Sequence, residues 1–251
     1  MSEYLAPVFA RLTLSSLFRA IRHGWEMFLI TRPLSVSYAM IFAVIGVVIL
    51  IGIERASFAP MIFPLAGGFM LVGPVLLSGF FAMADRVRRD ELCRFSDIVH
   101  GFSRTSREML TIALVCTLLF MIWVADVATV YGFTVGRVPA SLLTLFFPSK
   151  NVLSFMIWSS VLGALLAFVI FSISAFSVPL LYYRRAGLVQ AIVSSVTAVF
   201  ANLLPSLLWA VILAVTIIGS ILIFPLFLLT FPVLAFASHA LYRELFPELS
   251  V

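Results

Sequence analysis

One carboxylate in this 251-residue chain lies well inside an apolar stretch and could bind an ion or a proton. Asp126 stands in the sequence IWVADVATVYG, where a charged carboxylate in lipid costs about 2.5–3.5 kcal/mol and so must face protein or water. It is either a coupling site or a carboxylate that is hydrogen-bonded to Thr129, Tyr131 or a neighbouring helix. We favour the structural role, because no Lys or Arg lies at the same depth as a countercharge.

A single imidazole, His239, lies in the last apolar stretch, four residues before Arg243. It could act as a ligand or proton relay, but a lone histidine near a helix end is more often a satisfied polar contact. A metal site needs a cluster of Cys, His or carboxylate side chains at ligand spacing, and the sequence has none. We therefore expect no metal and no cofactor.

Three prolines lie in helices that are predicted to return across the membrane: Pro74, Pro179 and Pro232. A proline inside a helix removes a hydrogen bond and frees a carbonyl, which a transporter can use at membrane depth. Together with Asp126 they make a candidate solute or ion site. Catalytic signatures such as a nucleophile elbow, a Walker loop or a dinucleotide fingerprint are missing, so we expect no enzyme activity.

The composition is that of a multi-pass membrane protein, with 63% hydrophobic and 11% charged residues and a mean hydropathy of +1.19. A soluble domain has about a quarter charged residues. We expect one integral membrane domain over residues 1–251, all-α in fold. The net charge of +5 fits basic residues beside membrane spans rather than nucleic-acid binding.

Long uncharged stretches predict the spans, since about 20 apolar residues cross the hydrocarbon core. The stretch 152–183 exceeds a straight crossing, so it must tilt, bend near Pro179 or begin at the interface. The uncharged stretch 203–242 would be about 60 Å long as one helix, so it must be a hairpin that turns near Gly219–Pro225. Six spans follow, in three hairpins: 34–53, 61–84, 109–131, 152–183, 203–220 and 223–242.

A helix along the cytoplasmic membrane surface is predicted before each outgoing span. These helices cover residues 11–30, 95–104 and 187–201. The first carries an apolar stripe from Leu14 to Leu29 and should end at Arg32-Pro33, since a residue before proline avoids the α region. In the third, an apolar stripe of leucine, isoleucine, four valines and Phe200 opposes a polar side that includes Ser194 and Ser195.

The basic residues orient the chain. With both termini in the cytoplasm, thirteen of the sixteen Lys and Arg residues lie on the cytoplasmic side, which is the asymmetry that the positive-inside rule requires. Some of these arginines could also contact anionic lipid headgroups or a partner protein. The candidates are Arg86, Arg88, Arg89, Arg94, Arg184 and Arg185.

Several segments resemble one family. Gly73-Pro74, the arginine-rich run Asp85–Arg94 and the following FSDIVHGF are similar to the bacterial predicted inner-membrane proteins grouped as domain of unknown function 2189. The similarity continues through AFSVPLLYYRR at 175–185, the segment 202–210, and FPVLAFASHALYREL at 231–245. The resemblance implies a six-helix protein of the bacterial inner membrane and implies no catalytic residues.

Two functions remain for a protein of this kind. The first is a structural or accessory subunit that docks on a larger membrane complex or organises lipid. The second is a small-solute or ion transporter or channel with its site near the prolines of the returning helices. Apart from Asp126 and His239, the predicted spans contain only hydroxyl groups as polar lining, so we favour the first.

Overall fold

In the computed structural model, the described residues are 9–55, 77–103, 106–136, 148–222 and 224–247. Every regular element within these ranges is a helix, which confirms the all-α prediction for this part of the chain. Residues 77–88 are helical as well, although the stretch before them lies outside the described residues.

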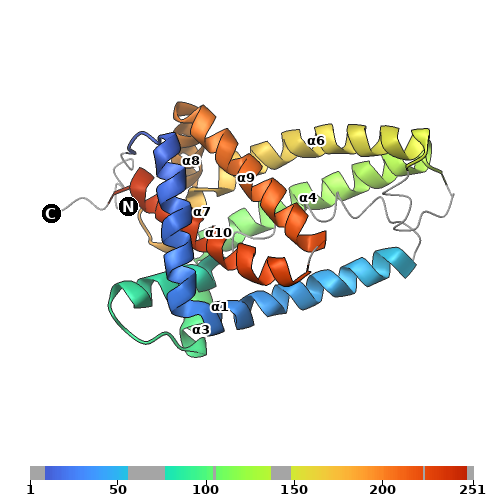
Figure 1. The fold of residues 1–251 in the computed structure, drawn as a ribbon. Coiled ribbons are helices and arrows are strands. Elements are labelled where there is room, and N and C mark those ends of the chain that lie inside the picture. The colour runs from blue at the N-terminus through green and yellow to red at the C-terminus, as the bar shows by residue number, and fades with distance from the viewer. Residues whose placement is uncertain (1–8, 56–76, 104–105, 137–147, 223, 248–251) are drawn as a thin grey trace.

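The first helix, α1, runs from Leu14 to Arg55 without interruption. The prediction of a surface helix over 11–30 that ends before Pro33, followed by a separate span 34–53, is therefore wrong about the boundary. Pro33 lies inside α1 and bends the helix instead of ending it. Figure 1 shows the N-terminal part of α1 running across the other long helices and its C-terminal part running along them.

Packing on both sides of Pro33 explains why the helix continues. The N-terminal part contacts α10 through small side chains, and Gly24 approaches so closely that an added Cβ would lie 2.4 Å from the Val233 carbonyl oxygen. Beyond the proline, Tyr38 and Phe42 join an edge-to-face aromatic cluster with Phe80 and Phe231. These contacts offset the hydrogen bond that the proline removes, a loss of about 3 kcal/mol in a helix interior.

Five helices among the described residues are long and apolar enough to cross a membrane. Besides α1, they are α4 (Arg107–Thr134), the pair α6 (Lys150–Ser174) and α7 (Ser177–Tyr182) taken together, α9 (Leu203–Leu222) and α10 (Phe224–Leu245). They correspond to the predicted spans 34–53, 109–131, 152–183, 203–220 and 223–242. The remaining predicted span, 61–84, lies mostly outside the described residues.

The long stretch 152–183 bends, as one of its predicted alternatives required. Helix α6 ends at Ser174, and α7 begins at Ser177, with Pro179 in the first turn of α7, where a proline is tolerated. The stretch 203–242 is divided between α9 and α10, whose ends meet on either side of residue 223.

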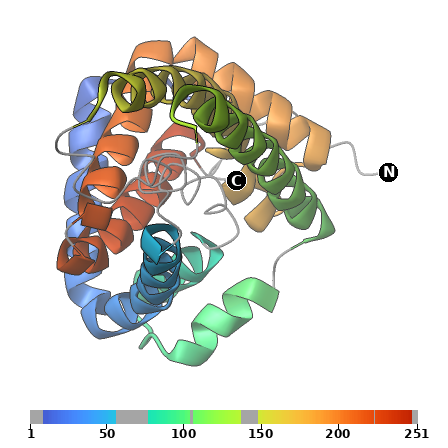
Figure 2. The same cartoon turned by 90° about the vertical axis from the view of Figure 1, so that its right-hand side faces the viewer.

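Two short helices, α3 (Phe95–Ser103) and α8 (Leu188–Ala201), lie at the same end of the bundle as the N-terminal part of α1. Figure 2 looks along the long helices and shows α9 and α10 beside the N-terminal part of α1, with α4 and α6 on another side. One end of the molecule is therefore crossed by short or oblique helices, while α4 and α6 extend away from it.

Candidate functional site: a polar network at one end of the bundle

Three segments that are distant in the sequence bring Asp85, Tyr183 and His239 together. Asp85 lies in the helical segment 77–88, Tyr183 directly follows α7, and His239 belongs to the last turns of α10. The Tyr183 hydroxyl donates a hydrogen bond to Oδ1 of Asp85 at 3.0 Å, and its oxygen lies 2.8 Å from Nε2 of His239.

The direction of the hydrogen bonds follows from the number of protons. A tyrosine hydroxyl has one proton, and here that proton goes to Asp85, so Nε2–H of His239 donates to the Tyr183 oxygen. Two aromatic rings enclose this chain of bonds: Phe81 packs on His239 with centroids 5.4 Å apart, and Tyr242 stacks on Tyr183 at 5.8 Å. His239 is only 2% exposed, so it is a buried partner that joins α10 to the other two segments.

The arginines predicted as lipid or partner contacts divide into two groups. Arg86 pairs with Glu91 and, at 2.8 Å, with Asp97, while Arg185 donates to the carbonyl oxygens of Phe246 and Pro247. These two guanidinium groups therefore hold the chain's own segments together. The other four predicted arginines, at positions 88, 89, 94 and 184, are exposed.

Asp97 was not singled out by the sequence, yet it organises the turn before α3. Its Oδ1 accepts from Arg86, and its Oδ2 accepts from the backbone N–H of Arg94 at 2.8 Å, just before the helix begins. An acidic side chain at the third helical position commonly reaches back in this way, so the spacing from Arg94 was a usable signal.

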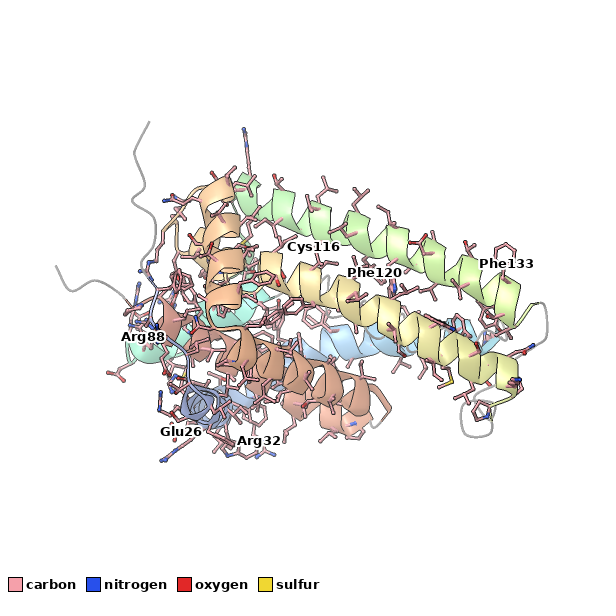
Figure 3. The ribbon with its side chains drawn as sticks, turned by 90° about the horizontal axis from the view of Figure 1, so that it is seen from above. Glu26, Arg32, Arg88, Cys116, Phe120 and Phe133 are labelled. Carbon is pink, nitrogen blue, oxygen red and sulfur yellow. The ribbon has the colours of Figure 1, made fainter. Side chains whose placement is uncertain are left out.

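The start of α1 is joined to the same end of the bundle. Arg19 and Ser16 both donate to Glu244 near the end of α10, each at 2.5 Å. Asn202 accepts from the backbone N–H of Leu12 at 2.7 Å. Charged side chains gather here: Figure 3 shows Glu26 and Arg88 toward this end and Phe133 at the far end of α4.

Asp126 lies apart from this network, on the exposed surface of α4. The predicted contact with Thr129 does not form, because the Thr129 hydroxyl donates to the backbone carbonyl of Ala125 at 2.8 Å. Within the described part of the chain, no hydrogen bond or ion pair joins the Asp126 carboxylate to another residue.

The break between α6 and α7 is closed by a side chain that the sequence did not mark as special. In an unbroken helix the N–H of Phe176 would donate to the carbonyl of Ser172. Here the Ser195 hydroxyl, from α8, lies between them: it accepts from Phe176 N–H at 3.2 Å and donates to the Ser172 oxygen at 2.8 Å.

The prolines that the sequence proposed as site residues lie apart from one another. Pro179 is beside this break, Pro232 is inside α10, and Pro74 is outside the described residues.

Residues 62–182 match the family model described as "Predicted integral membrane protein (DUF2189)". No curated protein and no solved structure matches the chain. The similarity that the sequence suggested beyond residue 182 stays a prediction. Over residues 62–182 the resemblance is confirmed: this part of the chain is similar to a family that is described as predicted integral membrane proteins and whose function is unknown.

Proposed function

We propose that this chain is a non-enzymatic structural or accessory protein of the bacterial inner membrane, which docks on a larger membrane complex or organises lipid. The observation that carries the proposal is the Ser195 bridge. A transporter could present the backbone groups at a helix break to a solute, whereas Ser195 satisfies the N–H of Phe176 and the carbonyl of Ser172 at the break before Pro179.

The hydroxyl groups of the apolar helices support the same conclusion. Thr117, Thr129 and Ser174 each donate to the carbonyl four residues earlier in their own helix at 2.8 Å. Such bonds satisfy the hydroxyl inside lipid without a partner from another helix or from a solute. They give these residues a packing role and leave little polar surface for a permeating solute.

The proposed topology has six spans with both termini in the cytoplasm. It rests on the thirteen-to-three division of basic residues and on the length of α1. At 42 residues this helix is about 63 Å long, twice the hydrocarbon core, so one part must lie along the surface. The N-terminal part of α1, α3 and α8 would then rest on the cytoplasmic leaflet, where the chain's arginines gather.

Asp126 is the observation that favours the transporter as a second candidate. A carboxylate on an apolar exposed surface could couple an ion to transport, or it could face a partner protein that supplies a donor. The two candidates differ in what Asp126→Asn does, because the amide keeps hydrogen-bonding capacity and loses the charge.

The experiment compares wild-type protein with Asp126→Asn in two assays. Extraction from native membranes in a mild detergent, followed by native mass spectrometry, should give an assembly of fixed stoichiometry that Asp126→Asn preserves. In proteoliposomes with a pH-sensitive dye, neither protein should dissipate a proton gradient faster than empty vesicles. A wild-type flux that Asp126→Asn abolishes, from a chain extracted alone, would overturn the accessory role in favour of transport.

A further inference from the structure

Helix α8 has its faces arranged opposite to those of a helix on the surface of a soluble protein. Its buried side consists mainly of small residues, among them Ala191, Ser194, Ser195 and Ala198. Its outer side carries Val189, Val193 and Phe200, which are 73%, 57% and 57% exposed. These three recur at helical spacing and form one apolar stripe, here called the α8 stripe, that the described part of the chain leaves largely exposed, although the Phe200 ring contacts Phe168 of α6 edge-to-face.

The buried side of α8 is fixed by hydrogen bonding and close approach rather than by its hydrophobicity. Ser195 has to reach the break between α6 and α7, where it bonds Phe176 and Ser172. Small neighbours at Ala191 and Ala198, both fully buried, allow that approach. Once Ser195 faces inward, Val189 and Val193 face outward, and an environment other than water has to stabilise them.

The charges near α8 identify that environment. Between Asp126 and Glu244 the sequence contains no Asp or Glu, while Arg184 and Arg185 immediately precede α8. Arg185 is occupied by the carbonyl oxygens of Phe246 and Pro247, but Arg184 is exposed. The carboxylates of the elements nearby are engaged elsewhere, Asp85 by Tyr183 and Glu244 by Ser16 and Arg19.

We propose that the α8 stripe lies in the boundary between headgroups and acyl chains, and that Arg184 selects anionic phospholipid there. An amphipathic helix binds such a boundary through its apolar area and through attraction of its cations to anionic lipids. The surface thus fits a leaflet rich in phosphatidylglycerol rather than an acidic protein. This proposal rests on the proposed function only in placing α8 at the membrane surface.

The depth of α8 is the first test. Single cysteines replace Val193 on the α8 stripe and, as the water-exposed reference, Arg89 in the turn after segment 77–88, in a protein that carries Cys93→Ser and Cys116→Ala. Each cysteine receives a fluorophore, and the protein is placed in nanodiscs with lipids that carry a quencher on the acyl chain. Quenching should be strong at 193 and weak at 89. Strong quenching by a water-soluble quencher at 193, or shielding from both quenchers, would overturn the proposal, the latter in favour of a protein partner.

Lipid selectivity is the second test, and it uses wild-type protein, Arg184→Gln and the control Lys150→Gln, whose charge lies at the far end of α6. Native mass spectrometry measures retention of phosphatidylglycerol against phosphatidylcholine. Arg184→Gln should lower the preference by about fivefold, the factor expected for one arginine near an anionic leaflet, and Lys150→Gln should leave it unchanged. Equal preference in Arg184→Gln and wild-type protein would refute the role of Arg184.

Inorganic phosphate in the buffer separates a lipid site from a phosphate site. Excess free phosphate should not displace the retained phosphatidylglycerol, because the α8 stripe contributes the acyl contacts; full displacement would mean that only the headgroup binds. A fixed-stoichiometry protein assembly that shows no lipid preference would refute this proposal and leave the accessory function intact.

Discussion

At the scale of single residues, Ser195 joins three elements with one hydroxyl group. It replaces a helical hydrogen bond that the bend between α6 and α7 breaks, and both partners are buried backbone groups. A buried backbone group without a partner costs about 1–3 kcal/mol, more than an average hydrogen bond contributes.

Ser195→Ala should therefore destabilise the protein by about 1–3 kcal/mol, because the N–H of Phe176 and the carbonyl of Ser172 lose their shared partner. Unfolding in mixed micelles with increasing sodium dodecyl sulfate measures the loss. The control is Thr197→Ala, two residues along the same helix at an exposed position. If both variants unfold at the same detergent fraction, the bridge does not stabilise the bend.

Tyr183 offers a second test at this scale, since its hydroxyl contacts both Asp85 and His239. A double-mutant cycle of Tyr183→Phe and His239→Leu should give a coupling energy of about 0.5–3 kcal/mol, as expected for residues in one network. Additive effects of the two substitutions would mean that the contact between Tyr183 and His239 does not stabilise the packing of α10 against the end of α7.

At the scale of elements, the contact between α1 and α10 decides the course of the N-terminal helix. Gly24→Ala should destabilise the protein by about 1–3 kcal/mol or more, since the new methyl group would meet the Val233 carbonyl and Ala237, and backbone cannot move aside easily. Gly46→Ala is the matched control in the same helix, because an added Cβ there meets nothing within 4 Å. Its effect should be neutral or stabilising by up to about 1 kcal/mol.

The same contact explains what the sequence could and could not predict. Hydropathy located the apolar helices, because length and lack of charge suffice for that. The end of the first helix at Pro33 was predicted wrongly, since the local preference of proline was outweighed by packing against α10, which no local pattern reports.

Which face of a helix is buried was also harder to predict than where the helix lies in the sequence. The predicted apolar side of the first helix divides in the structure: Leu17 and Phe28 are buried, whereas Phe18 is 75% exposed. Alanine and serine contribute to the inner side of that part of α1 and of α8 alike. In a membrane, where lipid is as apolar as leucine, small residues and hydrogen bonds direct helix packing, so hydrophobicity alone does not identify the buried face.

At the scale of the whole molecule, the polar contacts between segments gather at one end. Asp85 with Tyr183 and His239, Arg86 with Asp97, and Glu244 with Arg19 all join helices there, at the end where most of the arginines are predicted to face the cytoplasm. The far parts of α4 and α6 rely on apolar contacts such as Trp123 against Gly163 and Tyr131 against Phe155. A membrane protein with this asymmetry should have its more polar end in one aqueous compartment.

The topology prediction follows from that asymmetry and is tested by labelling with a membrane-impermeant thiol reagent in intact spheroplasts. Cysteines at Ser57 and Lys150 should be modified from outside, and cysteines at Glu3 and Leu249 only after the membrane is opened. The native Cys93 gives little background, because its half-buried thiol donates to the Met83 carbonyl and burial raises its pKa, which keeps it protonated and unreactive at neutral pH.

Modification at 249 in intact spheroplasts would place the C-terminus outside and remove the hairpin of α9 and α10 as a pair of spans. Protection of 57 would instead mean that the stretch between α1 and residue 77 does not reach the outer surface, and the count of six spans would be wrong.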